Sequence, residues 1–183
     1  MHWPIYQASH ILRASGVILY PTETVWGIGC DPFNSAALRR VISIKRRDAH
    51  KGLILVAADI SQLEFLLSDI TAEQRAQLES CWPGPHTFLV PHKGRVHPLV
   101  HGKFSTVAVR VSSNPKVKAL CEQFGGPIVS TSANYAGRPT VRSSVQARKL
   151  LGEEVDFILS GPIDGSAAPS RIVDLQTGRV IRG

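Results

Sequence analysis

The sequence predicts an α/β (α+β) fold in which a sheet of mixed parallel and antiparallel strands is flanked by helices. Short apolar segments alternate along the chain with longer segments whose apolar residues recur at helical spacing, which is the pattern of strands joined by helices. The chain closes with two short segments, 171–175 and 179–181, around a Gln-Thr-Gly turn that is typical of a hairpin. Part of the sheet is therefore expected to be antiparallel.

Length and composition predict a single domain over 1–183. The 183 residues, 43% of them hydrophobic, are enough to bury a sizeable core. No apolar segment is long enough to span a bilayer, and the N-terminus lacks the basic and apolar regions of a signal peptide. Cys30, Cys81 and Cys121 are odd in number and far apart, which argues against a disulfide framework and against a zinc site. We therefore expect a cytoplasmic protein that does not contact a membrane.

The net charge of +7 favours an anionic partner, such as nucleic acid or a nucleotide. Many basic proteins carry such a charge for solubility only. Here, however, the lysines and arginines gather in three segments, which lie at 45–51, 93–103 and 138–149.

Each expected element in the first half of the chain has a start or stop signal. Pro4 suits the first turn of a helix, Asn34 is a suitable N-cap, and Thr71 with Gln74 forms a capping box. Pro83-Gly84-Pro85 stops the helix that the capping box opens. The elements expected here are helices over 4–15, 34–45, 59–67 and 71–82 and strands over 17–20, 53–58 and 87–90.

The second half carries similar signals. Asn114 caps a helix whose first position is Pro115, and Gly125-Gly126 ends that helix. Ser143 and Gln146 form a second capping box. The elements expected here are strands over 105–111, 127–129 and 155–159, helices over 114–124 and 143–152, and the closing hairpin.

The segment 20–31 follows the first strand and combines hydroxyls, a carboxylate, an indole and two glycines. Loops at strand ends commonly build ligand sites, because the sheet holds them in place. Gly27 and Gly29 allow the backbone to approach a ligand closely. The alternative is a tight corner between strands, with Thr22 and Glu23 on the surface.

The cluster of Lys45, Arg46 and Arg47, followed by Lys51, predicts a phosphate site, since lysine offers phosphates a point charge and arginine a bidentate fork. The alternative is that these cations simply complement the C-terminal dipole of the helix before them. Three adjacent cations exceed what one helix end needs.

Two further polar features lie on expected strands. Arg110 alternates with the valines of its strand and so lies on the opposite face, where it needs an anionic partner if it is buried. An ordinary exposed arginine is the alternative. The segment 130–134, Ser-Thr-Ser-Ala-Asn, follows a strand and can hydrogen-bond phosphate or adenine, or cap a local turn.

The sequence lacks the common motifs of metal sites, nucleotide-binding loops and catalytic nucleophiles. His86, His92, His97 and His101 lie close together, but the proline and glycines between them and the lack of a carboxylate favour a solvated loop over a metal site. The chain has no P-loop, no dinucleotide fingerprint and no nucleophile elbow. An enzyme of this sequence would act by positioning charges and hydroxyls around its reactants.

Five segments in this order resemble the YrdC-like family, the threonylcarbamoyl-AMP synthases, over essentially the whole chain. The length matches the short, single-domain bacterial TsaC-type form. The segments are Pro-Thr-Glu-Thr-Val-Trp-Gly-Ile-Gly at 21–29, the basic cluster at 45–53, Trp-Pro-Gly-Pro-His-Thr at 82–87, Val-Ala-Val-Arg-Val at 107–111, and Ser-Thr-Ser-Ala-Asn at 130–134.

The resemblance implies an open, twisted mixed sheet with a concave basic face. It also implies an enzyme, a nucleotidyltransferase that joins L-threonine, bicarbonate and ATP into threonylcarbamoyl-AMP and releases pyrophosphate. A tRNA threonylcarbamoyl-transfer complex would use the product, and Mg²⁺ would arrive on the ATP phosphates. No metal site on the protein is expected.

The resemblance further implies roles for individual residues. ATP would be bound by Lys45, Arg47, Lys51, Ser130, Ser132, Asn134 and Arg182, of which Lys45 and Arg47 are the candidate catalytic residues. Threonine would be bound by Thr24, Arg110 and Ser170, with Arg110 on its carboxylate.

Some positions depart from the family pattern. Trp26 replaces the usual Tyr or Phe, and we expect it to keep a stacking or wall-forming role. Lys51 and Val56 replace an Asn and a His of the longer relatives, so Lys51 adds charge and Val56 removes one threonine contact. Ser170-Arg171 replaces a Ser-Thr pair.

Two other functions stay open. One is a non-catalytic double-stranded RNA- or tRNA-binding protein in RNA or ribosome maturation, which the basic charge supports. The aromatic residues of single-strand binders and any RNA-recognition signature are missing. An enzyme of the first kind could still contact tRNA weakly. The other is carbamoyl transfer of the hydrogenase-maturation type, which comes with further segments that this chain lacks.

Overall fold

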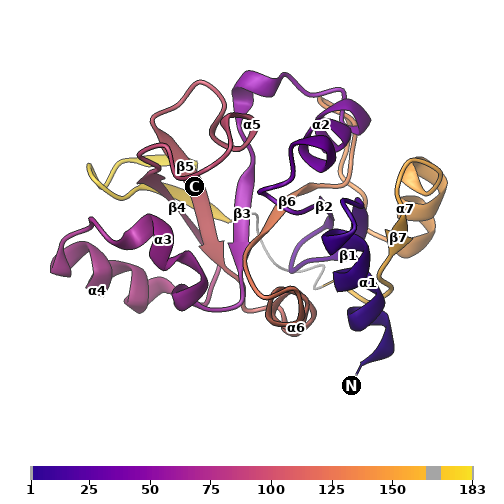
Figure 1. The fold of residues 1–183 in the computed structure, drawn as a ribbon, viewed down its shortest axis with the longest axis horizontal. Helices are drawn as coiled ribbons and strands as arrows, with labels where there is room; N and C mark the ends of the chain where they lie inside the picture. Colours follow the sequence, from indigo (N-terminus) through magenta and orange to yellow (C-terminus); the bar gives the residue numbers. More distant parts are fainter. Residues whose placement is uncertain (1, 164–169, 183) are drawn as a thin grey trace.

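The computed structural model describes residues 2–163 and 170–182. Within them, nine strands form a sheet in the order β7-β1-β2-β6-β3-β5-β4-β8-β9 (Figure 1). The strands are β1 (Ile18–Pro21), β2 (Trp26–Gly29), β3 (Ile54–Ala57), β4 (His86–Pro91), β5 (Thr106–Val111), β6 (Ile128–Ser132), β7 (Phe157–Ile158), β8 (Arg171–Asp174) and β9 (Val180–Arg182).

The sheet is mixed, as the sequence predicted. Strand pairs β1/β7, β3/β5 and β4/β8 are parallel. Pairs β1/β2, β2/β6, β3/β6, β4/β5 and β8/β9 are antiparallel, and the last of these is the expected closing hairpin.

Helices and short 3₁₀ turns connect the strands. The α-helices are α1 (Trp3–Arg13), α2 (Ser35–Ile44), α3 (Glu64–Leu67), α4 (Ala72–Cys81), α5 (Pro98–His101), α6 (Pro115–Phe124) and α7 (Ser144–Leu151). The 3₁₀ turns are η1 (Ala49–Lys51) and η2 (Ile60–Leu63). No helix among the described residues is both long enough and apolar enough to cross a membrane.

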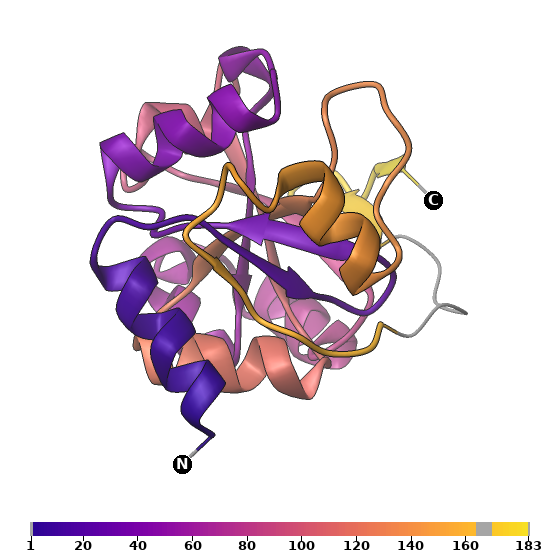
Figure 2. The same cartoon turned by 90° about the vertical axis from the view of Figure 1, so that its right-hand side faces the viewer.

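Two hydrophobic cores lie against the sheet. The larger core buries the valines of β5 together with residues of α2, α3 and α4. The smaller core lies between the sheet and helices α1 and α6, which cross and pack against each other (Figure 2). Leu12 of α1 and Leu120 of α6 are fully buried there against Ile128 of β6.

Strand alternation places polar side chains beside the smaller core. On β6, Ile128 packs under α6, whereas Ser130 and Ser132, two and four residues later on the same face, line a cavity. On β5, Val109 is in the larger core and Arg110 lines the cavity, so the predicted opposite orientation of Arg110 is confirmed. The helices thus cover one end of this face and leave the other end for a site.

The structure corrects several expected elements. The segment 20–31 is a hairpin, in which β2 pairs with both β1 and β6 and the turn occupies 22–25. The hydroxyl-rich segment after Val129 is part of β6, not a loop beyond it. The expected helix over 59–67 is a 3₁₀ turn followed by one α-helical turn, and the short helix α5 occupies part of the expected histidine loop.

The two capping boxes differ. At α4, Thr71 and Gln74 satisfy each other's backbone N–H groups, as predicted. At α7, Ser143 accepts from the Gln146 N–H, but the Gln146 side chain accepts from the Arg142 N–H, one residue before the cap. The second box is therefore only half formed.

Candidate active site

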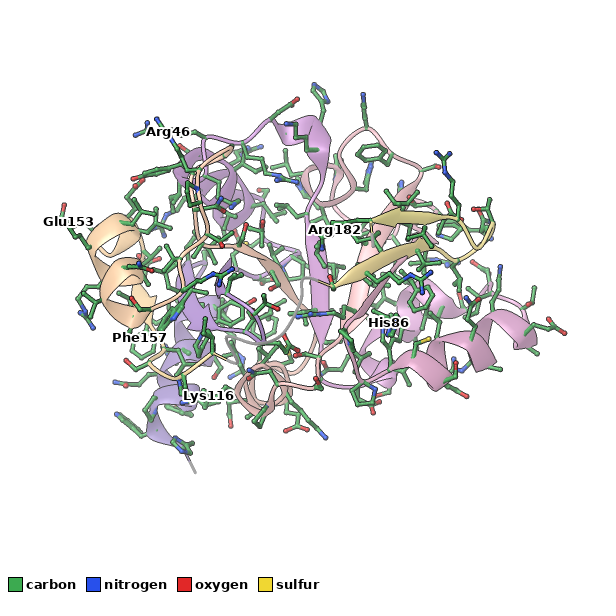
Figure 3. All side chains as sticks on the ribbon, turned by 180° about the vertical axis from the view of Figure 1, so that it is seen from behind. Arg46, His86, Lys116, Glu153, Phe157 and Arg182 are labelled. Carbon is green, nitrogen blue, oxygen red and sulfur yellow. The ribbon has the colours of Figure 1, made fainter. Side chains whose placement is uncertain are left out.

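A cavity of about 600 Å³ opens on the part of the sheet that α1 and α6 leave uncovered. Residues of β2, β3, β5 and β6 form its floor, and residues of β4, β8 and β9 form one side. In Figure 3, Arg182 of β9 lies over the middle of the sheet, while Arg46 and Glu153 lie at the periphery. Segments far apart in the sequence therefore share one concave surface.

The lining of this cavity is cationic and rich in hydroxyl groups. Among the described residues it includes no Asp or Glu. Such a surface attracts an anion that carries several oxygen acceptors. The cations that line it are Arg47, Lys51, Arg110, Arg142 and Arg182, and the hydroxyl groups include those of Thr22, Thr24, Thr87, Ser130, Thr131, Ser132 and Ser170.

Arg47 and Lys51 reach the cavity from the segment after α2. Asn34 caps this helix by accepting from the Ala37 N–H, as predicted. Arg47 is held by the Gly52 carbonyl oxygen, which accepts from Nε at 3.2 Å and from Nη2 at 3.0 Å. Burial lowers the pKa of this guanidinium from its usual value. Lys51 is exposed and lies beside it on the lining.

Lys45 is buried behind the cavity and is not among its described lining residues. Its Nζ donates to the carbonyl oxygen of Ser132, and to the carbonyl oxygen and Oδ1 of Asn134 at 3.0 and 3.2 Å. Burial, and then the charge of Arg47, lower the pKa of Lys45 to about 8. Lys45 therefore fixes the end of β6 from behind.

Asn134 is likewise buried and engaged. Its Oδ1 accepts from the Ser132 hydroxyl at 2.7 Å, and its Nδ2 donates to the Arg138 carbonyl oxygen at 2.5 Å. Ser132 itself lines the cavity, as does Ser130. Of the four side chains predicted around the nucleotide here, Ser130 and Ser132 thus lie at the surface of the cavity, whereas Lys45 and Asn134 hold the strand end.

Arg110 has the anionic partner that its position requires. Its Nη2 donates to Glu23 Oε2 at 2.8 Å, and the other oxygen of that carboxylate accepts from the Ser112 hydroxyl at 2.6 Å. Burial would raise the pKa of Glu23, but the Arg110 charge and the Ser112 hydrogen bond outweigh it and hold this pKa below its usual value. Glu23 is thus no surface residue of the turn.

Ser170 is oriented by two neighbours. Its Oγ accepts from the Thr87 hydroxyl at 2.9 Å and from Arg182 Nη2 at 3.2 Å. Arg182 also donates to the Ser170 carbonyl oxygen. A hydroxyl oxygen that accepts twice has its own proton left to donate, so Ser170 offers a hydrogen-bond donor at the cavity wall.

Two expectations about the 20–31 segment are wrong. The Trp26 indole is 1% exposed, belongs to the larger core and is not among the described cavity-lining residues, so it forms no wall. Gly29 serves packing, because a Cβ there would lie 2.3 Å from the Val129 carbonyl oxygen and 2.9 Å from Tyr20 Cε1. Gly27 and Thr24 do line the cavity.

Several cavity residues were not predicted from the sequence. Arg142 is brought in because the Val141 carbonyl oxygen accepts from the Trp26 N–H, which ties the segment before α7 to β2. Its place in a basic segment was the only available signal. Thr87 could have been found from its strand alternation, whereas the Glu23 contact across the sheet has no local signal.

The histidines form no metal site. The His92 and His101 rings stack with centroids 3.8 Å apart, and each ring has a nitrogen 3.1 Å from the Phe104 carbonyl oxygen. His97 caps α5 by accepting from the Leu99 N–H. Within residues 2–163 and 170–182, no group of three or more His, Cys, Asp or Glu residues could hold a metal ion.

Known proteins match nearly the whole chain. A family model named Sua5_yciO_yrdC, described as telomere recombination, matches residues 10–183. The threonylcarbamoyl-AMP synthase of Saccharophagus degradans is 53% identical over 176 residues, which are 96% of this chain and 92% of that protein. The threonylcarbamoyl-AMP synthase of Chromohalobacter salexigens is 51% identical over 178 residues, which are 97% and 96% of the two chains.

A solved structure shares the fold. Sua5 from P. abyssi, complexed with L-threonine, superimposes with a TM-score of 0.91 at 29% identity. The match covers 98% of this chain and 53% of that chain.

Proposed function

Because this chain belongs to the Sua5/YciO/YrdC family, as its motifs predicted, we propose that it is an L-threonylcarbamoyladenylate synthase. The enzyme condenses L-threonine, bicarbonate and ATP to threonylcarbamoyl-AMP and pyrophosphate, a nucleotidyl transfer. The names of relatives that are more than half identical over nearly their full length support this activity. The threonine complex of the Sua5 structure supports threonine as a substrate.

The reaction needs positioning and charge more than a covalent nucleophile. The threonine amine attacks the carbon of bicarbonate, and loss of water leaves a carbamate. A carbamate oxygen then forms a bond to the α-phosphorus of ATP, and the bond from that phosphorus to the bridging oxygen breaks as pyrophosphate leaves. Negative charge builds up on the phosphate oxygens, so fixed cations stabilise the transition state.

We place the triphosphate among Arg47, Lys51, Arg142 and Arg182, the other arginines and lysine of the described cavity lining. None of these four has a carboxylate partner among the ion pairs of the described residues. Mg²⁺ comes with ATP and is bound mainly through its phosphates and water, which agrees with a lining free of described carboxylates. Ser130 and Ser132 line the nucleotide side, while Lys45 and Asn134 support it from behind.

We place threonine near Arg110, with Ser170 where this part of the cavity borders Arg182. The Arg110 guanidinium uses Nη2 for Glu23 and presents the rest of its donors toward a substrate carboxylate. Thr24 and Ser170 supply hydroxyls to the same space. Val56 borders this part of the cavity but is fully buried in the smaller core, so it leaves threonine binding to the polar groups. The two substrates thereby meet over Ser130 on β6.

One observation carries the proposal: a single cavity joins one arginine that pairs with a carboxylate to four cations that have no such partner within residues 2–163 and 170–182. The test is release of pyrophosphate from ATP and bicarbonate with each amino acid in turn. We expect release to depend on threonine. Release without threonine, or with any amino acid equally, contradicts the proposal.

The wider biological role follows from the product. We propose that residues 1–183 act as a single domain in the cytoplasm, and that a tRNA threonylcarbamoyl-transfer complex consumes the adenylate. The non-catalytic RNA-binding alternative has less support, because relatives that are 53% and 51% identical to this chain are named as synthases. RNA binding with a steep salt dependence and no nucleotide binding would favour that alternative.

A further inference from the structure

The turn between β1 and β2 crosses the sheet to reach Arg110. Its strand β2 is separated from β5 by β6 and β3, yet Glu23 in the turn contacts both Arg110 of β5 and Ser112 just beyond it. The side chains of Arg110 and Glu23 are only 13% and 18% exposed. The carboxylate is thus held from both sides close to the cavity.

This ion pair makes the cavity electrostatically uneven. Arg110 is the one cation of the described lining that pairs with a carboxylate; Arg47, Lys51, Arg142 and Arg182 do not. The immediate surroundings of Arg110 therefore have close to zero net charge, whereas the other four lining cations have no carboxylate partner among the ion pairs of the described residues. A partly buried ion pair often contributes little stability compared with apolar side chains, so stability alone does not explain a pair at this position.

The two substrates also differ in the amount of negative charge that they bring to the cavity. Threonine brings one carboxylate, and ATP brings a polyphosphate that would bind strongly to any free arginine fork. A cavity with uniform positive charge would take phosphate at both ends and block the amino acid. A feature that disfavours the wrong ligand is one way to obtain selectivity between such ligands.

We propose that Glu23 is a specificity-determining residue: by neutralising Arg110, its carboxylate makes the amino-acid end of the cavity accept a singly charged carboxylate and reject phosphate. The inference rests on the proposed function only for the identity of the two ligands. Ser112 supports Glu23 in this role, because its hydroxyl donates to Glu23 while its own Oγ accepts from the Asn114 N–H.

Glu23→Gln tests the charge with little change in shape, since the amide oxygen still accepts from Arg110. Initial rates of adenylate formation, followed by chromatography of the nucleotides, give the inhibition by inorganic phosphate. In the wild type we expect phosphate to compete with ATP alone. In the variant we expect phosphate to compete with threonine as well. Its inhibition constant against threonine should be at least about tenfold lower than in the wild type.

Two further variants test whether the effect depends on the position of the Glu23 charge and on its partner Arg110. Glu153→Gln removes the same charge from an exposed position at the periphery and should leave the pattern as in the wild type (Figure 3). Adding Arg110→Met to Glu23→Gln should abolish the gained phosphate competition, because the anion has lost its partner. Thermal unfolding of every variant checks that the fold persists.

The outcomes separate this inference from the proposed function. An active wild type whose Glu23→Gln variant shows no phosphate competition with threonine overturns the inference alone. A wild type without threonine-dependent activity overturns the proposed function. In that case calorimetric titration of the wild type and of Glu23→Gln with inorganic phosphate decides the inference. One additional phosphate site in the variant, or one that binds at least about tenfold more tightly than in the wild type, supports the inference. Identical titrations of the two proteins overturn it.

Discussion

Arg47 and Gly52 are joined by two hydrogen bonds, in which Nε and Nη2 of the guanidinium donate to the same carbonyl oxygen. The contact fixes the arginine at the cavity while Nη1 stays available for a ligand. Arg46, its neighbour, instead stacks its guanidinium 4.6 Å from the centre of the Tyr135 ring, away from the cavity lining. Two adjacent arginines thus have different environments.

Arg47→Ala should therefore weaken ATP binding selectively. We expect the KM for ATP to rise about tenfold or more, because charge-assisted hydrogen bonds to phosphate are lost, with threonine affinity unchanged. Steady-state kinetics with ATP and threonine varied in turn would measure it. Arg46→Ala is the matched control and should leave both constants near wild type. Equal losses in the two variants would mean that only overall charge matters.

Thr87→Val should disturb the orientation of Ser170. Valine keeps the shape of Thr87 but cannot donate to Ser170 Oγ, so that hydroxyl becomes free to rotate. We expect the KM for threonine to rise about threefold to tenfold with little effect on thermal stability. In the double variant with Ser170→Ala, the loss should equal that of Ser170→Ala alone. Additive losses would show that Thr87 acts independently of Ser170.

The depressed pKa of Lys45, at about 8, predicts a pH dependence of ATP binding. Its charge is present below pH 8 and is lost above it, so ATP affinity measured by calorimetry should fall as the pH rises from 7 to 9. Lys45→Met should bind ATP weakly at pH 7 and converge with the wild type at higher pH. Lys149→Met, which removes an exposed lysine of α7, should follow the wild-type curve.

The same shift has the opposite effect on stability. The Lys45 pKa is lower in the folded protein than the usual 10.5, so the unfolded state binds more protons between about pH 8 and 10.5. The contribution of Lys45 to the free energy of unfolding should accordingly rise with pH across this range. Urea unfolding of the wild type and Lys45→Met isolates it as the difference between the two. A difference that is constant with pH would contradict the lowered pKa.

Gly29→Ala should destabilise the sheet where β2 meets β6. The new Cβ would lie 2.3 Å from the Val129 carbonyl oxygen, which is backbone and cannot easily move. We expect a loss of about 2–3 kcal/mol in the free energy of unfolding, measured in urea. Gly126→Ala is the control, since nothing lies within 4 Å of a Cβ there. A small effect at Gly29 would mean that the strands can separate slightly.

The sequence predicted those elements whose signals are local. The caps at Asn34, Thr71 and Asn114 are formed as expected, because each depends on residues within three positions. Alternation on β5 correctly placed Arg110 opposite the valines. By contrast, β2 was predicted as a turn because its two glycines are poor strand formers. Pairing with both neighbouring strands makes this segment a strand.

The site could be predicted less completely, because much of it depends on contacts between distant segments. The basic cluster and the Ser/Asn segment were found from composition, but their division into residues at the cavity and residues behind it depends on burial. Lys45 and Asn134 have the same polar character as Arg47 and Ser132, yet they are buried against each other. No local pattern distinguishes a lysine that faces a ligand from one that faces two carbonyl groups.

The contact between Glu23 and Arg110 also has a consequence for how the chain folds. The two residues are 87 positions apart, and Ser112 is 89 from Glu23, so the contact must await closure of a long loop and assembly of the strands between them. We therefore expect this contact to form late in folding, after the nucleus. Its removal should speed unfolding and leave the refolding rate nearly unchanged. The residue that sets the charge balance of the cavity thus also slows the opening of the folded molecule.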